Sequence, residues 1–568
     1  MGQVLAAATR KDRLPILALI VAIWRAHGSW RDGPSILGAV AQALNGRSKG
    51  AKVFSDVVGV YVVVALVRTL LHVKRGIRTA SLKKIKDSVG SSILGVLKNV
   101  PGAKEKIKGE FEKMEIDLEK SLKPSEREQI FEIPADGMPH ELVLSKMQAF
   151  ADKEEKQWQE GWVSGAVYHG GKEHIDLQNR AYELFSISNP LHPDVWPSVM
   201  KFEAEIVAMT ANLLNGGRKS VCGTMTSGGT ESILMATKSH RQWALKTRGI
   251  TEPEIVAPVT AHAGIDKACD ILGIKLISVP VNPHTHAVEP SVLRKYVTSD
   301  TIMIYSSAPQ YPHGIIDPIE ELSKVAKANN CGLHVDCCLG GYVLPFAKKL
   351  GYAIPKFDFE LDGVTSMSVD THKYGYAAKG TSVVLYRDHE LRRHQYFTYP
   401  AWPGGLYVTP STAGSRPGGL SAACWASLVA MGEKGFLENT KKIMETQRKI
   451  KAAVKDMEDI ELCGDPIAMI VAFKSSKFSI YNVADKMHNK GWSLNSLQNP
   501  PSVHLCVTLR TVEASDRFID DLRSAAKECT ANPNEVDKGA AVYGMASALP
   551  AGPIHEMLQT YTDVVLKV

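Results

Sequence analysis

The sequence contains no CxxC pair, although it has nine cysteines among 568 residues. Cysteine pairs at that spacing are typical of structural zinc sites, and even numbers of regularly spaced cysteines are typical of disulfide frameworks. The odd number, the irregular spacing and the adjacent Cys337 and Cys338 favour neither. We therefore expect no metal site, and we expect the main part of the chain to lie in a reducing compartment.

Internal repeats and low-complexity tracts are also absent, and the net charge of +7 is small for this length. Such a charge does not indicate a protein that binds nucleic acid. The excess of Lys and Arg is concentrated before about residue 125, which favours a segment close to a membrane. A hydrophobic content of 44% and a charged content of 22% are ordinary for a globular enzyme. The length predicts two or three folded units.

Long apolar runs are scarce and confined to the first hundred residues. Leu14–Trp24 is too short to cross a bilayer, and it imitates a signal peptide without a cleavage pattern after it. Val53–Val73 is long enough, because its 21 residues span about 31 Å as a helix. Asp56 lies near one end, and Arg68 can reach the interface. We predict a transmembrane helix over 53–73, with a buried or surface-lying helix as the alternative.

The distribution of basic residues around this span predicts its orientation. Six Lys and Arg residues follow it between positions 74 and 86, and three precede it between 47 and 52. The positive-inside rule then places the C-terminal part in the cytoplasm. We divide this region into an N-terminal segment over 1–52, the span over 53–73, and a basic flank with a helical stalk over 74–140. Apolar residues interspersed among charges over 104–123 indicate that the stalk helix is amphipathic.

Short apolar strands alternate with helices from about residue 199 onward, which is typical of a mostly parallel sheet with right-handed crossovers. We predict an α/β fold with a large domain over 141–430, including an N-terminal arm, and a smaller C-terminal α/β domain over 431–568. The predicted strands are 220–224, 254–258, 276–279, 301–306, 332–335, 366–369, 382–386, 467–473, 492–493 and 503–509. The predicted helices are 142–158, 198–214, 231–246, 264–272, 420–431 and 435–455, with others near Tyr481 and Glu513.

Two motifs in the large domain suggest how a phosphorylated aldehyde would be held. Lys373 stands in Val369–Tyr376, and a lysine amine can condense with an aldehyde, as few side chains can. The glycine turn Ser227–Ser232 lies between a strand and a helix, where free backbone N–H groups bind phosphate, and Thr230 adds a hydroxyl. The turn lacks the Lys of a nucleotide P-loop, so the phosphate of a cofactor fits better.

Three further side chains stand where ligands bind an open α/β sheet. Asp336 ends a predicted strand, and beside a pyridine nitrogen its carboxylate would keep that nitrogen protonated. His262 follows another strand end, where a flat imidazole can stack on a ring, and His372 precedes the lysine and can donate to a phosphate. Alone, Asp336 is more often a turn cap and a single histidine more often structural. The order of these motifs along the chain is what carries the interpretation.

This order resembles the fold-type-I pyridoxal phosphate enzymes, and several segments are similar to the sphingosine-1-phosphate lyases. These segments are Asn189–Asp194, Thr226–Ser232, Asp370–Tyr376 and Ala413–Gly419, together with Ser164–Tyr168 and Pro309–Gly314. The resemblance runs from about residue 140 to about residue 545. The first fifty residues match no pattern of that family.

The resemblance implies a homodimer with pyridoxal 5′-phosphate bound between subunits. Lys373 would hold the cofactor as a Schiff base, Asp336 would pair with its ring nitrogen, and His262 would stack on its face. Its phosphate would be held by Gly229, Thr230 and His372 of one subunit and by Ser415 of the other. The phosphate of the substrate would be bound by Tyr168, His192 and Lys379.

The implied reaction is cleavage of the C2–C3 bond of a phosphorylated sphingoid base by a retro-aldol step, giving a long-chain aldehyde and phosphoethanolamine. The general base is left open among Lys373, Tyr374, Tyr376 and the substrate phosphate. A membrane helix ahead of the catalytic domain also fits the family, which implies a single-pass protein of the endoplasmic reticulum membrane facing the cytosol.

Two other functions remain open at this point. An amino-acid decarboxylase shares the glycine turn, the Asp and the His-Lys pair, but its substrate carries a carboxylate instead of a phosphate. A membrane-tethered scaffold would keep the fold without catalysis, although no expected catalytic position is substituted in this sequence.

Overall fold

The computed structural model describes residues 112, 115, 116, 119, 130–154, 157–217, 220–535 and 551–567. The chain forms two compact units, of which the larger spans His140–Tyr543 and the other comprises Met1–Pro139 and Gly544–Val568. The predicted segments 1–52 and 53–73, and most of 74–140, lie outside the described residues. Among the residues that are described, no helix is long and apolar enough to cross a membrane.

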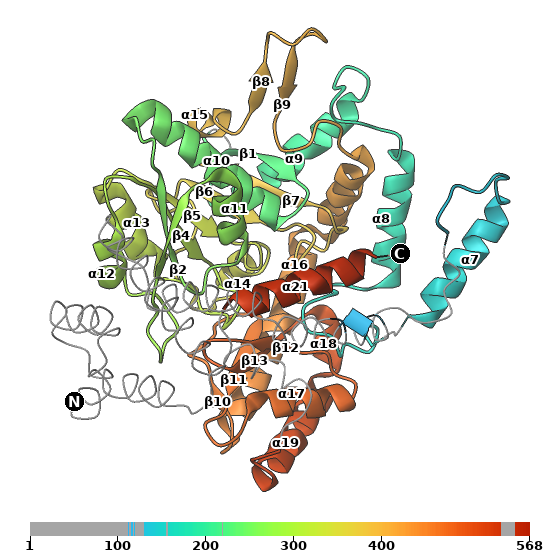
Figure 1. Ribbon diagram of the computed structural model, residues 1–568, viewed down its shortest axis with the longest axis vertical. Coiled ribbons are helices and arrows are strands. Elements are labelled where there is room, and N and C mark those ends of the chain that lie inside the picture. Colours follow the sequence, from blue (N-terminus) through green and yellow to red (C-terminus); the bar gives the residue numbers. More distant parts are fainter. Residues whose placement is uncertain are drawn as a thin grey trace, which may run out of the picture. The chain divides into compact units, whose positions relative to one another are not determined.

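A seven-stranded sheet forms the centre of the larger unit (Figure 1). Its strand order is β1-β7-β6-β5-β4-β2-β3, and β7 alone runs antiparallel to its neighbours β1 and β6. The strands are β1 (Cys222–Thr226), β2 (Glu254–Pro258), β3 (Lys275–Val279), β4 (Thr301–Ser307), β5 (Gly332–Asp336), β6 (Ser366–Val369) and β7 (Ser382–Tyr386). The predicted mostly parallel α/β sheet is therefore confirmed.

Helices cover both faces of this sheet, so its central strands are buried on both sides. All residues of β4 and β5 are buried. Alternate residues of one strand belong to different cores: Ile255 and Ala257 pack with α10 (Gly229–Arg248) and α11 (Gly264–Leu272), whereas Val256 packs into the larger core on the opposite face. This alternation is the two-residue period of a strand.

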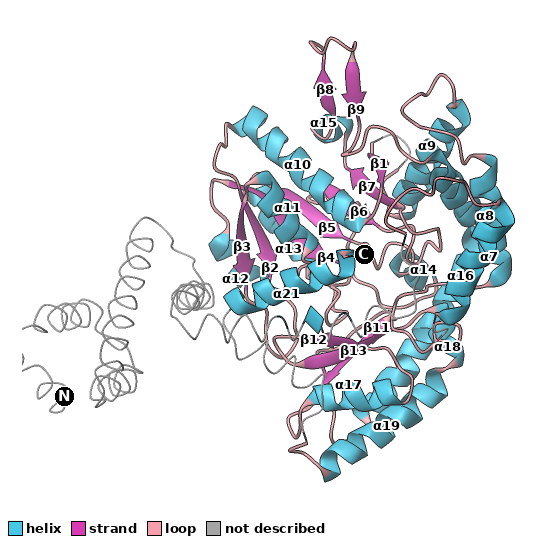
Figure 2. Cartoon of the chain, turned by 45° about the vertical axis from the view of Figure 1, so that its right-hand side comes forward, coloured by secondary structure: helices cyan, strands magenta, loops and turns pink. Residues whose placement is uncertain are grey.

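A second sheet of four antiparallel strands lies toward the C-terminal end of the same unit (Figure 2). Its order is β10-β11-β13-β12, with β10 (Glu461–Leu462), β11 (Ile470–Lys474), β12 (Asn495–Leu497) and β13 (Ser502–Cys506). The helices α17 (Ile480–Asn489), α18 (Leu509–Glu513) and α19 (Ser515–Ala531) accompany it. The predicted strand at 492–493 is wrong: Ser493 forms only an isolated bridge with Val163, and β12 begins at Asn495.

One long helix, α16 (Gly418–Lys455), leads from the first sheet to the second. Gly432 interrupts it with a φ of 57° and a ψ of 173°. The sequence predicted two helices, ending at 431 and restarting at 435, and the break falls in that gap. The division into domains at 430/431 stays a prediction, because both sheets belong to one compact unit.

The remaining elements surround the large sheet or precede it. They are α7 (His140–Lys153), α8 (Lys172–Leu184), α9 (Pro197–Leu213), α12 (Pro290–Leu293), α13 (Ile319–Ala328), α14 (Leu344–Lys349), α15 (His389–Arg393) and the hairpin of β8 (Phe397–Tyr399) and β9 (Tyr407–Thr409). The smaller unit contains α21 (Ala551–Leu566), after which Lys567 pairs with Glu119 of the predicted stalk at 2.5 Å. The sequence predicted neither α8, α13 nor the hairpin.

Candidate active site

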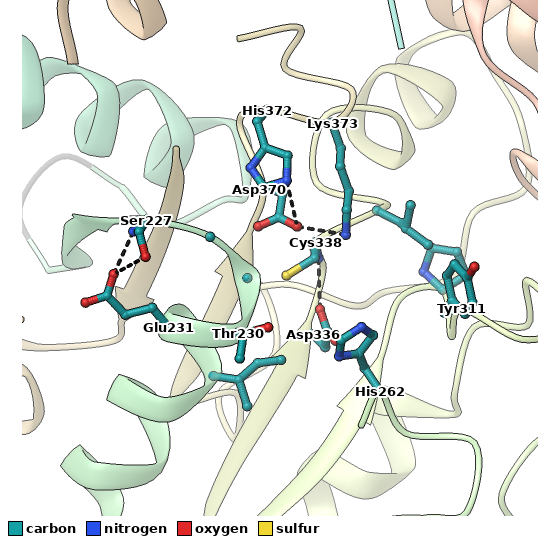
Figure 3. Close-up of a pocket in the computed structure, with 15 residues that line it drawn as sticks. Ser227, Thr230, Glu231, His262, Tyr311, Asp336, Cys338, Asp370, His372 and Lys373 are labelled. Atoms are coloured by element: carbon teal, nitrogen blue, oxygen red, sulfur yellow. Dashed lines mark hydrogen bonds and ion pairs between the residues drawn. The ribbon is translucent and has the colours of Figure 1, made fainter. Parts of the chain in front are cut away.

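The carboxyl ends of the parallel strands open into a cavity of about 380 Å³. Turns after β1, β2, β4, β5 and β6 contribute its walls, as expected for ligand sites in open α/β sheets. Figure 3 shows Lys373 and His372 reaching toward Asp370, with Asp336 and His262 near the strand ends. The lining residues are Ser227, Gly228, Gly229, Thr230, Glu231, Ile233, His262, Pro309, Tyr311, Asp336, Cys338, Leu339, Asp370, His372 and Lys373.

Lys373 carries the amine of this cavity. Its Nζ lies 2.7 Å from Oδ2 of Asp370, whose side chain is almost fully buried. Burial acts to lower the pKa of Lys373, but the charge of Asp370 outweighs it and leaves that pKa above its usual value. The other oxygen of Asp370, Oδ1, is buried and has no hydrogen-bond partner among the described residues. A buried carboxylate oxygen in this state is a place for a donor from a bound molecule or water.

Asp336, at the end of β5, is the second carboxylate of the cavity. Tyr305 on β4 donates its hydroxyl to Oδ2 at 2.5 Å, and the Cys338 amide donates to Oδ1 at 3.0 Å. Ser368 donates to Oδ1 at 3.2 Å. Burial acts to raise the pKa of Asp336, but the nearby His262 and the donors from Tyr305 and Cys338 leave it below its ordinary value. The carboxylate is therefore held ionised.

The glycine turn joins β1 to α10 at the edge of the cavity. The first N–H groups of a helix have no acceptor within the helix, so those of Gly229 and Thr230 are available to a ligand. A Cβ on Gly229 would lie 2.7 Å from the Cys338 sulfur and 2.9 Å from Asp370 Oδ1, so this position admits only glycine without a shift. Glu231 fixes the turn by accepting from the Ser227 amide at 2.6 Å and from its hydroxyl at 2.8 Å.

The neighbours of two histidines in the cavity show whether the Nδ1 atom of each ring donates or accepts a hydrogen bond. His262 Nδ1 accepts from the Gly264 amide at 3.0 Å, and Tyr311 meets its ring edge-on with the centroids 6.5 Å apart. His372 Nδ1 donates to the Thr381 carbonyl at 2.5 Å, and burial lowers the pKa of His372. In a neutral His372 ring the remaining nitrogen, Nε2, is an acceptor, so donation to a phosphate there requires the charged form.

The proposed substrate residues Tyr168 and Lys379 lie against each other but outside the walls of the cavity. Lys379 Nζ stands 4.8 Å from the centre of the Tyr168 ring, and Tyr374 meets the same ring edge-on at 4.8 Å between centroids. Burial raises the pKa of Tyr168 well above its usual value. Partial desolvation and the charge of Lys373 lower the pKa of Lys379. The pair is thus an ammonium that lies over the ring of a protonated tyrosine.

His192 and Ser415 are not brought into the cavity of this single chain. Both side chains are exposed. Their loops are nevertheless tied together, because Asn189 Oδ1 accepts from the amides of Leu191 at 3.0 Å and Arg416 at 3.1 Å. Their assigned roles stay predictions, as do those of the six residues that share the cavity.

Two of the candidate bases are held away from the cavity. Tyr374 is 1% exposed and donates its hydroxyl to the Val507 carbonyl at 2.6 Å. Tyr376 is buried, with its ring stacked on Phe436 at 5.7 Å between centroids. Burial raises the pKa of both tyrosines. Neither hydroxyl is placed to take a proton from a molecule in the cavity.

The sequence did not single out several residues that shape the cavity. Asp370 and Tyr311 lie in the family-like segments Asp370–Tyr376 and Pro309–Gly314, and a carboxylate three residues before Lys373 is a signal visible in the sequence. Tyr305 gave no signal, since it reads as one more apolar residue of β4. Cys338 was noted only as half of a cysteine pair; burial raises the pKa of its thiol, so it is neutral.

The residues present fit pyridoxal 5′-phosphate. The turn at Gly229 leaves space for a phosphate only because this residue has no side chain, and the amides at the start of α10 can donate to that phosphate. Asp336 is a buried, ionised carboxylate for a ring nitrogen, and Lys373 supplies the amine. These three features face one cavity.

Comparisons with known proteins agree with this chemistry. A family model described as the pyridoxal-dependent decarboxylase conserved domain matches residues 187–476. A sphingosine-1-phosphate lyase of Dictyostelium discoideum is 48% identical over 470 residues, covering 82% of this chain and 88% of that protein. The solved sphingosine-1-phosphate lyase of Burkholderia pseudomallei K96243 is 41% identical, with a TM-score of 0.71, and the match covers 75% of this chain and 99% of that one. The glutamate decarboxylase of Lactobacillus brevis is 19% identical with a TM-score of 0.62, covering 72% and 97%, and shows the fold alone.

The fold, the cavity and the matching domain define a pyridoxal phosphate-dependent enzyme with the decarboxylase-like α/β fold. The high sequence identity to the sphingosine-1-phosphate lyases, over most of this chain and most of each relative, identifies the family within this class. The chain belongs to the sphingosine-1-phosphate lyase family.

Proposed function

We propose that this protein is a pyridoxal phosphate-dependent carbon–carbon lyase that cleaves the C2–C3 bond of phosphorylated sphingoid bases. The products are a long-chain aldehyde and phosphoethanolamine. The observation that carries the proposal is one cavity containing the Lys373 amine, the ionised Asp336 and the glycine cradle at Gly229. When bound, pyridoxal phosphate supplies the electron sink that such a bond cleavage needs.

The protein groups divide the task of holding the cofactor. The amides of Gly229 and Thr230 bind its phosphate, and Asp336 keeps its ring nitrogen protonated. His262 lines the cavity near Asp336, where it would stack on the cofactor ring. Tyr305 donates its hydroxyl to the Asp336 carboxylate at 2.5 Å and so favours the ionised form of that carboxylate.

The substrate phosphate is proposed to bind at Tyr168 and Lys379. Lys379 supplies the positive charge, and the adjacent Tyr168 supplies a hydroxyl that burial keeps protonated. His192 is proposed to complete this site from a second subunit. A charged head bound at this pair would present the amine and the C3 hydroxyl of the substrate to the cavity.

The proton transfers are assigned by elimination among the named candidates. The C3 hydroxyl must lose a proton as the bond breaks, and C2 must gain one. Tyr374 and Tyr376 are buried with raised pKa values, so they do not serve. Of the named candidates, Lys373 Nζ, 2.7 Å from Asp370, and the substrate phosphate therefore stay open.

The test is incubation of the purified protein with cofactor and sphingosine 1-phosphate, followed by detection of both products. Lys373→Ala should abolish product formation with the fold intact. Borohydride treatment followed by peptide mass analysis should place the reduced cofactor adduct on Lys373. An adduct elsewhere contradicts the assignment. Release of carbon dioxide from acidic amino acids, without aldehyde from the lipid, would favour the decarboxylase.

We further propose that the active form is a homodimer in which Ser415 and His192 act across the interface. Large apolar side chains are exposed around their loops: Leu184 is 78% exposed, Ile187 84%, and Leu406 on the β8–β9 hairpin 88%. Apolar surface of this kind is usually covered by another protein surface. A second copy of the chain is the partner that would also complete the site.

Subunit complementation tests this arrangement. Lys373→Ala and Ser415→Ala chains should each be inactive or weak as homodimers. Mixed dimers should regain activity, because one of their two sites combines Lys373 of one chain with Ser415 of the other. No recovery on mixing, although mixed dimers form, would place Ser415 within its own subunit's site or outside the mechanism.

Residues 53–73 are proposed to anchor the protein in the endoplasmic reticulum membrane with the catalytic part facing the cytosol. The support is the length and hydrophobicity of the segment and the basic residues that follow it. The anchor would bring the enzyme to a substrate with a lipid tail. Retention of the full chain in membranes after an alkaline carbonate wash would agree, and protease digestion of sealed microsomes would report the orientation. Complete release by carbonate contradicts a span.

A further inference from the structure

The loop that follows Lys373 contains a residue in an unusual backbone conformation. Tyr376 has a φ of 58°, in the left-handed region that side chains larger than glycine rarely adopt. It lies three residues after Lys373 and three residues before Lys379. Such a conformation persists only where the surroundings impose it, so the contacts of Tyr376 show what determines the shape of this loop.

Side chains from two helices hold the carbonyl groups at this position. His174 and Gln178, one turn apart on α8, both donate to the Tyr376 carbonyl, His174 Nε2 at 2.8 Å and Gln178 Nε2 at 2.6 Å. Ser427 on α16 donates to the preceding Gly375 carbonyl at 3.4 Å, and its hydroxyl lies 3.0 Å from His174 Nε2. Two successive carbonyl groups are thus fixed from outside the loop.

The Tyr376 ring is held as well as its carbonyl. It stacks on Phe436 with 10° between the planes and meets His169 edge-on at 5.3 Å. His169 in turn stacks on His174 at 4.3 Å. Tyr376 is 4% exposed and is absent from the walls of the cofactor cavity. Its contacts therefore shape the loop and touch no reacting group.

The two ends of the loop lead to the two parts of the site. The Tyr376 amide donates to the Lys373 carbonyl at 3.0 Å, and the Ala377 amide donates to the Thr371 carbonyl at 3.0 Å. Beyond them Lys379 rests on Tyr168, which lies just before the start of α8. Helix α8 thus contacts the loop at Tyr376, and the segment just before α8 contacts it again through Tyr168 and Lys379.

We propose that His174 and Gln178 are positioning residues that hold the left-handed turn at Tyr376 and so set the separation between Lys373 and the phosphate-binding pair Lys379–Tyr168. The role of that pair rests on the proposed function above. A substrate that is fixed by its phosphate reacts only if its amine then meets Lys373 correctly. A displacement of about 1 Å at such a site costs about a hundredfold in rate.

The variants for the test are Gln178→Met and His174→Leu, which remove the donors while keeping helix-compatible side chains. His174→Gln, which retains a donor, is the conservative rescue, and Asn179→Ala on the exposed face of α8 is the matched control. Each donor-removing variant should lower kcat/KM for the phosphorylated substrate at least tenfold. His174→Gln should recover most of this loss, Asn179→Ala should change nothing, and cofactor affinity should stay within twofold in all four.

Hydrogen exchange provides a readout independent of the reaction. The amides of Tyr376 and Ala377 should exchange at least tenfold faster in Gln178→Met and His174→Leu, while the amides of β4 and β5 keep their wild-type rates. Unchanged exchange at Tyr376 and Ala377 overturns the proposal, whether or not the protein proves to be a lyase. Faster exchange throughout β4 and β5, or a loss that His174→Gln does not recover, would indicate a merely structural role and overturns it too.

Discussion

The hydrogen bond from Tyr305 to Asp336 gives the sharpest prediction of the site electrostatics. Tyr305→Phe removes one hydroxyl from a fully buried ring and leaves the carboxylate with the Cys338 and Ser368 donors. A hydrogen bond to a charged group contributes about 1.5–3 kcal/mol, which corresponds to about one to two pKa units. The pKa of Asp336, now below its ordinary value, should rise by that amount.

The consequence depends on pH. Because Asp336 stays ionised at pH 8 even after such a shift, kcat/KM there should change little. Where protonation of Asp336 limits the rate, the acidic limb of the kcat/KM profile should move upward by about one to two pH units. A carboxyl group whose pKa is lowered by folding stabilises the fold at pH values above its pKa in the unfolded chain. This stability is lost as the pH falls toward the lowered pKa. The variant should therefore lose about 1.5–3 kcal/mol of unfolding free energy at pH 7, and less as the pH falls.

A second buried tyrosine provides the control. Tyr386 is 0% exposed and donates to the neutral Gln395 side chain at 2.6 Å. Tyr386→Phe should cost about 0.5–1.5 kcal/mol of stability and leave the pH profile in place. Urea unfolding and initial rates between pH 5 and 9 measure both quantities. Two results together refute the reasoning. Tyr305→Phe would lose only as much unfolding free energy as Tyr386→Phe, and the acidic limb of its kcat/KM profile would stay in place.

Three further changes test separate parts of the structure. Gly229→Ala should weaken cofactor binding at least tenfold in an absorbance titration, because its Cβ would collide with Cys338 and Asp370. Gly228→Ala is the control and should lose less affinity, because a Cβ there meets nothing within 4 Å. Equal losses would contradict the binding of the cofactor phosphate at Gly229. Lys379→Met should raise KM for the phosphorylated substrate about tenfold, the factor for about 1.4 kcal/mol, with kcat less affected; unchanged kinetics would remove Lys379 from the phosphate site. Burial lowers the pKa of His313 and His334 to about 3, so the fold binds fewer protons than the unfolded chain below pH 6.5. Each should remove about 1.4 kcal/mol of stability per pH unit as the pH falls from 6.5, in urea titrations, and replacing either with Gln should flatten that slope.

The strands of the large sheet were predictable because each is a short apolar run between polar or glycine-rich segments. β2, β6 and β7 have the predicted bounds, and β1 lies two residues later than predicted. The hairpin of β8 and β9 was not predictable, since most of its side chains are exposed and show no alternation. Helix α8 was missed because its polar composition, with no buried residue, resembles a loop after glycines.

The principal groups of the site were predictable for a different reason. Asp336 ends a strand and His262 and Lys373 follow strand ends, and parallel strands place their carboxyl ends on one edge. What the sequence does not contain is the register between neighbouring strands. Ser307 pairs with Asp336 across β4 and β5, and this register brings the Tyr305 hydroxyl, two residues earlier, onto the carboxylate. A hydrogen-bond partner that depends on strand register, such as Tyr305, cannot be predicted from the order of residues along one strand.

The second sheet belongs to the site more closely than its separate pattern indicates. His504 on β13 donates to the Pro312 carbonyl at 2.9 Å and meets the Tyr311 ring at 4.8 Å, beside the cofactor cavity. Three residues further along, the Val507 carbonyl accepts the hydroxyl of Tyr374, the residue after Lys373. One short segment, 504–507, therefore holds a wall of the cavity and the loop that carries the amine. Because these contacts cross from one sheet to the other, a change in the C-terminal part should alter the site directly, although no residue of that part lines the cavity.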